Sequence, residues 1–226
     1  MIDSELARGH TALLLVDPYN DFLSEGGKLW PRIAATRNAA RLHANLRAVL
    51  RGARGAGVPV VTVPHHRYAP GNLDAWRFAT PYQTGSARAL VFQRGEWGGE
   101  WHPDIGPLPG ELVVKEHWAS SGFANTDLDL QLRQRGITHV VLVGLVANTC
   151  IEGTGRAASE LGYHVTLVAD ATAAFSNAAL RAAHDINASS YAHQLVATEH
   201  LLEQFSAIAL DTTHHHHHLH NNEEPS

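Results

Sequence analysis

Three side chains that could together perform nucleophilic catalysis follow predicted strands in this chain of 226 residues. Asp17 follows the apolar run Thr11–Val16, Lys115 ends the run Leu112–Lys115, and Cys150 comes shortly after a third run. A thiol at its ordinary pKa is mostly protonated at pH 7, and both an adjacent ammonium group and a helix N-terminus favour the thiolate. A carboxylate can take the thiol proton and later pass it to a leaving amine. The pattern predicts a cysteine nucleophile with Asp17 as its acid and base.

Cys150 is the only cysteine, which excludes a disulfide within one chain and a cysteine-rich metal cluster. It lies at the start of the helical pattern Thr149–Leu161, where a helix N-terminus would favour the thiolate. Free cysteine is also among the most buried residue types, and many such thiols only pack. A buried, inert thiol is therefore the alternative to a nucleophile.

The elements that must position these residues alternate between strands and helices. Short apolar runs predict the strands Thr11–Val16, Val58–Val63, Leu112–Lys115, His139–Val143, His164–Val168 and Gln194–Ala197. Helical spacing predicts helices over Ala34–Arg54, Thr126–Arg135, Thr149–Leu161, Asn177–Ala188 and a last segment that ends near Phe205. This alternation predicts an α/β fold of right-handed βαβ units, with a parallel sheet covered by helices on both sides. Ligands of such sheets bind at the carboxyl ends of the strands.

One domain is predicted over residues 1–210, with a long excursion over residues 64–110. The excursion contains several Trp and Tyr residues among Gly and Pro and no clear long helix. Connections of that length in a compact domain are usually functional, so we expect a lid or an oligomer contact. Residues 211–226 carry a histidine run without apolar periodicity, which indicates a disordered or tag-like tail, with a native metal-binding tract as the alternative.

Charge and composition narrow the choice of partners. The formal net charge is −5, and no glycine-rich phosphate loop follows any predicted strand, which argues against nucleic acid. No apolar stretch approaches the roughly 20 residues of a membrane span, and the N-terminus lacks the features of a signal peptide. We therefore predict a cytoplasmic protein with no nucleic-acid or membrane partner.

Four blocks of the chain resemble the isochorismatase-like cysteine hydrolases, a superfamily that includes nicotinamidases and N-carbamoylsarcosine, biuret and ureidoacrylate hydrolases. The blocks are LLVDPYNDF (14–22), VVKEHWASSGFANTDL (113–128), GITHVVLVGLVANTC (136–150) and GYHVTLVADA (162–171). The similarity runs from about residue 10 to about residue 205, with order and spacing kept. It implies a three-layer α/β/α fold with a six-stranded parallel sheet, commonly in a homo-oligomer.

Carried over residue by residue, the resemblance implies catalytic roles for Asp17, Lys115 and Cys150. It also implies a cis peptide between Leu145 and Val146. That peptide would direct the backbone N–H groups of Val146 and Cys150 at the developing oxyanion.

The chain departs from the family at three places. Val146-Ala147-Asn148 stands where many relatives have Ala-Thr-Asp, which alters side-chain hydrogen bonds in that turn. His65 and His66 stand near the place of the nicotinamidase metal site, but no matching Asp is present. Adjacent residues of an extended segment point to opposite sides, so we predict no metal and no cofactor.

The third departure concerns the lysine, because Ser121-Gly122-Phe123 lies one or two residues further from Lys115 than the family's spacing implies. Either the intervening loop has an insertion and Lys115 is in register, or Glu116 takes the catalytic place. Side chains alternate along a strand, so only one of the two can face Cys150. A cation favours the thiolate and a carboxylate opposes it, so we favour Lys115.

A cysteine in the nucleophile position predicts cleavage of a C–N bond in a small amide, imide or ureide through a thioester, with release of ammonia or an amine. Candidate substrate-binding residues are the aromatic side chains Tyr19, Trp76, Trp118 and Phe175. Two alternatives remain: a metal-assisted, nicotinamidase-like hydrolase that uses His65 or His66, and a non-catalytic oligomeric scaffold with a buried thiol.

Overall fold

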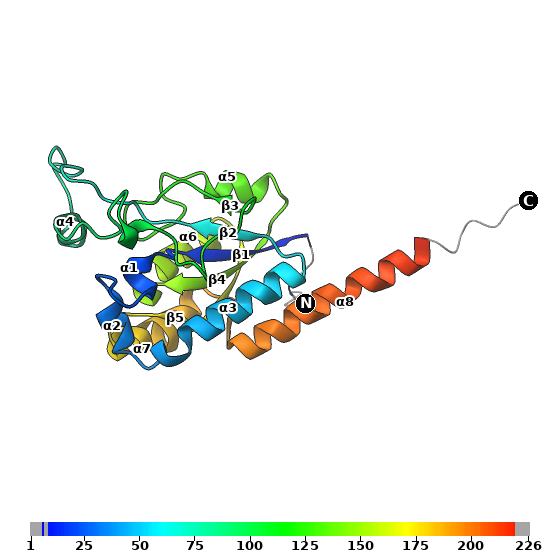
Figure 1. Cartoon of the computed structure of the whole chain (residues 1–226). Helices are drawn as coiled ribbons and strands as arrows, with labels where there is room; N and C mark the ends of the chain where they lie inside the picture. Colours follow the sequence, from blue (N-terminus) through cyan, green and yellow to red (C-terminus); the bar gives the residue numbers. More distant parts are fainter. Residues whose placement is uncertain (1–5, 7–8, 220–226) are drawn as a thin grey trace, which may run out of the picture.

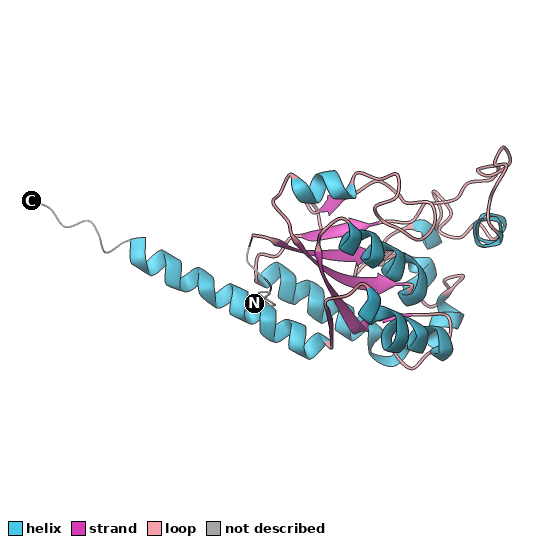
Figure 2. Ribbon diagram, turned by 180° about the vertical axis from the view of Figure 1, so that it is seen from behind, coloured by secondary structure: helices cyan, strands magenta, loops and turns pink. Residues whose placement is uncertain are grey.

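The computed structural model of the chain contains one sheet of six strands between two layers of helices (Figures 1 and 2). It describes residue 6 and residues 9–219, with side chains as far as residue 210. The strands are β1 (Thr11–Val16), β2 (Val60–Val63), β3 (Leu112–Val113), β4 (His139–Leu145), β5 (His164–Ala173) and β6 (Gln194–Val196). Their order is β3-β2-β1-β4-β5-β6, and every pairing is parallel. The predicted six-stranded parallel α/β fold is confirmed.

The centre of the sheet is buried on both faces because its strands are continuously apolar. Alternate residues of β1 enter two separate cores, with Leu13 and Leu15 in one and Leu14 and Val16 in the other. The first core is covered by α3 (Ala39–Gly55) and α8 (Thr198–Leu219), and the second by α5 (Leu128–Arg133) and α6 (Glu152–Glu160). The order reverses between β1 and its neighbours β2 and β4, which is where open sheets of this type bind ligands.

Several elements differ from the predicted bounds. The helix predicted over Ala34–Arg54 begins only at Ala39, as α3, and Ala34 ends a separate short helix, α2 (Trp30–Ala34), because polar side chains between them bond to backbone groups. Thr36 Oγ1 donates to the carbonyl of Ile33, and Asn38 Nδ2 donates to the carbonyls of two residues of β5. The remaining short elements are α1 (Asn20–Leu23), the 3₁₀ turns η1 (Trp97–Gly99) and η4 (Ala188–Ser190), α7 (Asn177–Arg181), and the π-helical turns η2 (Ala147–Ile151) and η3 (Ala182–Asn187).

The excursion over residues 64–110 carries one α-helix, α4 (Pro81–Arg88), which stands away from the sheet and has no buried residue (Figure 1). A capping box formed by Thr80 and Gln83 begins this helix. The base of the excursion is fastened to α1 by Asp21, whose carboxylate accepts hydrogen bonds from the backbone N–H groups of Phe92 (2.7 Å) and Lys28 (3.0 Å). Asp21 therefore has a structural role.

At the other end of the chain, α8 extends through residues 211–219 of the predicted tail, and residues 220–226 lie outside the described part. Among the described residues, no helix is long and apolar enough to cross a membrane.

Candidate active site

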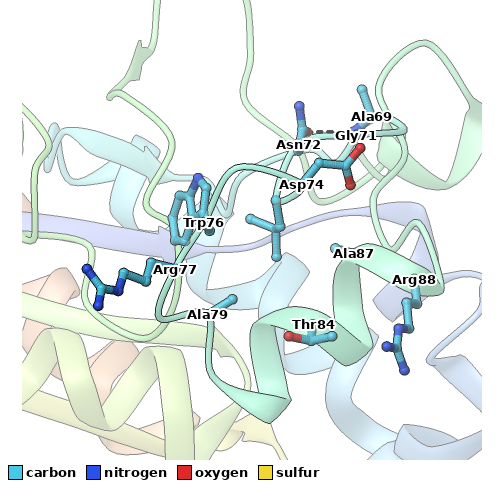
Figure 3. Close-up of a pocket in the computed structure, with 11 residues that line it drawn as sticks. Ala69, Gly71, Asn72, Asp74, Trp76, Arg77, Ala79, Thr84, Ala87 and Arg88 are labelled. Carbon is cyan, nitrogen blue, oxygen red and sulfur yellow. Dashed lines mark hydrogen bonds between the residues drawn. The ribbon is translucent and has the colours of Figure 1, made fainter.

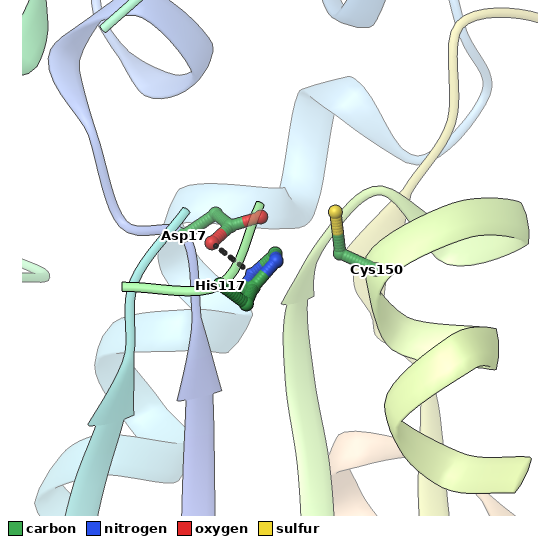
Figure 4. A group of neighbouring side chains, drawn as sticks. All are labelled: Asp17, His117 and Cys150. Atoms are coloured by element: carbon green, nitrogen blue, oxygen red, sulfur yellow. Dashed lines mark hydrogen bonds and ion pairs between the residues drawn. The ribbon is translucent and has the colours of Figure 1, made fainter. Parts of the chain in front are cut away.

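Asp17, His117 and Cys150 converge at the carboxyl ends of the central strands (Figure 4). One oxygen, nitrogen or sulfur atom of each lies within 4.8 Å of the others. All three side chains are fully buried, and the cluster lies at the switch in strand order described above. The sequence predicted the convergence of Asp17 with Cys150, but it did not predict His117.

Asp17 is held at the end of β1 in an unusual backbone conformation, with φ of 53°. Left-handed φ is uncommon for residues other than Gly, although Asp tolerates it, and such residues gather at functional sites. The Asp17 N–H donates to the carbonyl of Val63 in β2 (3.1 Å). On the other side, β4 passes so close that a Cβ at Gly144 would lie 2.2 Å from the carbonyl oxygen of Val16. Gly144 thus allows Cys150 and Asp17 to meet.

His117 lies beside the carboxylate of Asp17 (Figure 4). Its Nε2–H donates to Asp17 Oδ1 at 3.1 Å, and its Nδ1 has no hydrogen-bond partner. The backbone around His117 is tied to the end of β2: its N–H donates to the carbonyl of Pro64 (2.9 Å), and its carbonyl accepts from His66 (2.7 Å). Two backbone bonds and one side-chain bond fix the imidazole beside Asp17.

The prediction that Lys115 faces Cys150 is wrong. Lys115 is exposed, and its backbone N–H donates to Asp127 Oδ1 (2.8 Å). The cause is an extra residue on the β3 side between the pairing of Thr62 with Val113 and the bridge of His65 with His117. Val63 and Pro64 stand opposite Val114, Lys115 and Glu116. The extra residue shifts the alternation and brings His117 into the position where the resemblance implies a lysine.

Glu116, the alternative to Lys115, makes a different set of contacts. Its carboxylate accepts a hydrogen bond from Arg67 Nε (2.7 Å) and pairs with His66 Nδ1 (3.1 Å) and Arg94 (3.2 Å). Burial alone would raise the pKa of Glu116, but the hydrogen bonds from His66 and Arg67 outweigh burial and lower this pKa to about 2. Glu116 is an ionised anchor for the base of the excursion.

Cys150 is in the π-helical turn η2, which continues directly into α6. Burial, followed by the charge of Asp17, raises the pKa of the Cys150 thiol well above its ordinary value, and hydrogen bonds from Thr149 and the Val146 N–H act in the opposite direction. The thiol donates to the carbonyl of Ala119 (3.5 Å). The thiol is therefore neutral in the resting protein and needs a base to become a nucleophile.

The peptide between Leu145 and Val146 is cis, as the resemblance implies. The Val146 N–H lowers the pKa of the Cys150 thiol, which is the effect of a donor that stabilises negative charge beside the sulfur. The oxyanion role of the Val146 and Cys150 N–H groups stays a prediction.

The four aromatic residues predicted to bind substrate occupy different places. Tyr19 is fully buried, donates to the carbonyl of His65 (2.8 Å) and stacks on Phe92, so it packs the wall behind the site. Trp118 stacks on His66 with 3.6 Å between ring centroids, and Trp76 lies 4.9 Å from Trp118.

Two cavities border this region. Trp76 lines a polar cavity of about 470 Å³ within the excursion, together with Asn72, Asp74, Arg77 and Arg88 (Figure 3). Phe175 lines a cavity of about 320 Å³ whose wall also includes His65, Tyr82 and Arg32. The His65 ring lies 5.0 Å from that of His117, so His65 stands between the cavity of Phe175 and the cluster of Asp17, His117 and Cys150.

His65 and His66 do not form a metal site with each other. His65 Nδ1 bonds to the carbonyl of His66 (2.9 Å), whereas the nitrogens of His66 bond to Glu116 and Asn72. Within the described part of the chain, the cluster of Asp17, His117 and Cys150 is the group whose donor types could hold a metal ion. The absence of a metal stays a prediction.

Sequence reasoning missed His117, although the displaced Ser121-Gly122-Phe123 segment was a signal for it. His117 is two residues closer than Lys115 to that segment, which removes the discrepancy in spacing.

The fold is a parallel α/β sheet with a buried Asp, His and Cys at the carboxyl ends of its central strands, and comparison with known proteins assigns the family. A model of the isochorismatase domain matches residues 11–199, and the chain belongs to this family. It is thus an isochorismatase-like hydrolase, as its sequence predicted.

Several relatives of this chain are named as amidohydrolases or amidases. The chain is 32% identical over 173 residues to the ureidoacrylate amidohydrolase RutB of Caulobacter vibrioides, covering 72% of this chain and 76% of that protein. It is 32% identical over 192 residues to RutB of Variovorax paradoxus, covering 80% of this chain and 75% of that protein. The crystal structure of N-carbamoylsarcosine amidase from Thermoplasma acidophilum superposes with a TM-score of 0.63 at 29% identity, covering 83% of this chain and 96% of that chain. A cysteine hydrolase from Pseudomonas syringae pv. phaseolicola, at 22% identity, shares the fold with a TM-score of 0.76 over 92% of this chain and all of that one.

Proposed function

We propose that this protein hydrolyses a C–N bond of the carbamoyl group in a small organic acid through a thioester on Cys150. The observation that carries the proposal is the buried cluster of Asp17, His117 and Cys150. The relatives support the substrate class, because ureidoacrylate and N-carbamoylsarcosine both join a carbamoyl nitrogen to a carboxylate-bearing group.

Asp17 has the geometry of the general base. One of its oxygens, Oδ1, is occupied by His117, and the other, Oδ2, is buried without a partner. In the first step Oδ2 takes the thiol proton while the Cys150 sulfur attacks the carbonyl carbon, and the Val146 N–H stabilises the oxyanion. The tetrahedral intermediate then expels ammonia or an amine, which takes its proton from Asp17.

Water completes the cycle. Asp17, ionised again, removes a proton from a water molecule as that water attacks the thioester carbon. The C–S bond breaks and the thiol regains a proton. Throughout, the Nε2–H of His117 holds Oδ1 of Asp17, so that the free oxygen points at the reacting atoms.

The cavity of Phe175 supplies a binding group for a carboxylate. The Arg32 guanidinium lies 4.0 Å from the centroid of the Phe175 ring, and no hydrogen bond or ion pair is found for it among the described residues. A guanidinium stacked on a ring keeps its N–H groups available for bidentate binding of a carboxylate. We propose that Arg32 binds the acid group of the substrate.

A substrate panel tests the proposal. Ureido acids, N-carbamoyl amino acids, primary amides and cyclic imides are assayed for ammonia and amine release with wild type and Cys150→Ala. We expect release from the carbamoyl acids, none with Cys150→Ala, and a rapid-quench mass adduct on Cys150. Turnover by Cys150→Ala, or no release from any carbamoyl compound, would disprove the proposal.

Two further arms address the substrate acid and the metal. Arg32→Gln should raise KM for carbamoyl acids about tenfold while leaving KM for the corresponding uncharged amides unchanged. Treatment with a chelator should leave turnover intact. Loss of turnover after chelation, with recovery when zinc is added, would instead support a metal-assisted hydrolase.

A further inference from the structure

Two buried polar atoms beside the catalytic cluster have no hydrogen-bond partner in the protein: His65 Nε2 and the Tyr68 hydroxyl. His65 is 1% exposed and Tyr68 is fully buried. Their rings lie 5.9 Å apart, and the His65 ring lies 5.0 Å from that of His117. Leaving a buried polar group unpaired is costly, and such groups are few in native proteins. Two of them beside the reacting groups indicate a place that a ligand fills.

The hydrogen bonds of His65 define which of its nitrogens carries the proton. His65 Nδ1 lies 2.9 Å from the carbonyl oxygen of His66, which can only accept, so Nδ1 is the donor. Burial, the largest cause, lowers the pKa of His65 to about 4, so the ring is neutral at pH 7. The free Nε2 therefore presents a lone pair, which can accept an N–H from a ligand but cannot donate.

Tyr68 presents the complementary group. Burial is the largest cause that raises its pKa to about 12, so the hydroxyl keeps its proton and can donate. Its ring is next to that of His65, which in turn contacts the ring of His117. A lone-pair acceptor and a hydroxyl donor side by side match a group that carries both N–H and C=O.

The geometry points to His65 and Tyr68 as the specificity-determining pair of the substrate site: His65 Nε2 accepts an N–H of the substrate, and the Tyr68 hydroxyl donates to one of its oxygens. This inference rests on the proposed function and specifies the group that is recognised, a carbamoyl group with a free N–H. Sites built to hydrogen-bond a polar group reject analogues that lack it, because the protein atom is then left unpaired. Esters and fully N-alkylated ureas should therefore be poor ligands.

His65 also joins the two parts of the substrate site. It forms part of the wall of the 320 Å³ cavity that contains Arg32 and Phe175, and its other side faces His117. A carbamoyl acid could thus place its carboxylate at Arg32 and its carbamoyl group between His65, Tyr68 and Cys150.

Tyr68→Phe is the sharpest test, because it removes one oxygen that has no partner in the unliganded protein. Its unfolding temperature should equal or exceed that of wild type, whereas kcat/KM for a carbamoyl acid should fall about tenfold or more. Tyr191→Phe is the matched control, since the Tyr191 hydroxyl is also buried without a partner, but its ring packs against Gly155 and Arg156 of α6. Tyr191→Phe should leave kcat/KM unchanged.

His65 is tested by variants and by substrate methylation. His65→Leu should lower kcat/KM about tenfold or more, and His65→Gln, which offers a carbonyl acceptor at similar reach, should recover part of the loss. Methylation of the carbamoyl nitrogens of the substrate should lower kcat/KM strongly for the wild type and only slightly for His65→Leu. Equal losses in both proteins would overturn the role of His65.

Binding measured in a Cys150→Ala background separates this inference from the proposed function. Calorimetry with an uncleaved carbamoyl acid should show about tenfold weaker affinity when Tyr68→Phe is added. Unchanged affinity together with wild-type turnover would overturn the inference and leave the proposed function intact. Absence of turnover in wild type, with affinity that still depends on Tyr68, would overturn the proposed function alone.

Discussion

At the carboxyl end of the sheet His65 and His117 lie beside a carboxylate and a thiol, whereas at the amino end His139, His164 and His193 lie beside one another. The rings of His139 and His164, which are paired in register on β4 and β5, have centroids 4.8 Å apart. His164 and His193 stack at 4.5 Å. Both ends thus contain histidines in close contact, and both border a cavity.

The two ends differ in the chemistry of their neighbours. The lining of the 390 Å³ cavity at the amino end contains Thr138, Ser159, Tyr163 and the three histidines, but no carboxylate and no thiol among the described residues. His164 Nδ1 is buried without a partner there, as His65 Nε2 is at the other end. An unpaired buried nitrogen therefore does not identify a site by itself. A carboxylate, a nucleophile, and both a hydrogen-bond donor and an acceptor must lie close to it.

The largest expected effect is the loss of activity in His117→Ala. Without its Nε2–H, Asp17 loses the bond that orients its carboxylate, and kcat/KM for a carbamoyl acid should fall by about 10² to 10⁴-fold. His117→Lys should keep more activity, because an ammonium group can also donate to Asp17. Steady-state kinetics on the three proteins measure this.

His164→Ala is the matched control at the amino end and should leave kcat/KM within about twofold of wild type, as for most substitutions away from the site. A large loss in His164→Ala, or none in His117→Ala, would remove the functional difference between the two ends of the sheet.

A smaller effect, mainly on stability, is expected for Glu116→Gln. Its hydrogen-bonded partners hold the folded pKa of Glu116 at about 2, below its ordinary value of 4.5. Its stabilisation is therefore fully present above pH 4.5 and is lost as the pH falls toward 2. After allowance for solvent screening, the variant should lose about 1–2 kcal/mol of unfolding free energy at pH 7. Urea denaturation at pH 7 and pH 3 measures this difference, which should shrink at the lower pH.

Activity of Glu116→Gln should remain within about tenfold of wild type, since the Glu116 carboxylate contacts His66, Arg67 and Arg94 rather than the thiol. A loss as large as that of His117→Ala would mean that Glu116 belongs to the catalytic group.

The sequence was sufficient to predict the sheet because its strands are buried on both faces. Thr11–Val16 and His139–Val143 are continuous apolar runs that can only be central parallel strands once helices alternate with them. The same alternation predicted that Asp17 and Cys150 meet, since both follow central strands.

The third member of the cluster depended on geometry that no periodicity encodes. β3 has only two paired residues, and one extra residue beyond them decides which side chain turns inward. Lys115 and His117 have the same parity along an ideal strand, so alternation could not choose between them. The orientation of His65 and Tyr68 likewise depends on backbone contacts of the long excursion, which no local pattern specifies.

A still smaller effect concerns the pH dependence of stability at the amino end. Burial, followed by the charges of His139 and His193, lowers the folded pKa of His164 to about 4, below its ordinary 6.5. Its contribution to stability is therefore full above pH 6.5 and is lost as the pH falls from 6.5 to 4. Because His164 is partly exposed, this loss should amount to about 1 kcal/mol.

His164→Gln should lose correspondingly less stability than wild type between pH 7 and pH 4.5. His65 also has a folded pKa of about 4 and contributes in both proteins, so only the difference between them is diagnostic. Identical pH profiles of unfolding free energy would show that the stacked histidines are not coupled to folding.

The smallest effect is expected for Lys115→Ala, which should leave kcat/KM within about twofold of wild type. Lys115 follows a strand at the carboxyl end of the sheet, as Asp17 does, but its side chain is exposed and its backbone bonds to Asp127. Position at this edge is therefore not sufficient for function, because the side chain must also enter the buried cluster. A hundredfold loss in Lys115→Ala, measured beside His117→Ala, would return the catalytic cation to the lysine and reduce His117 to a packing residue.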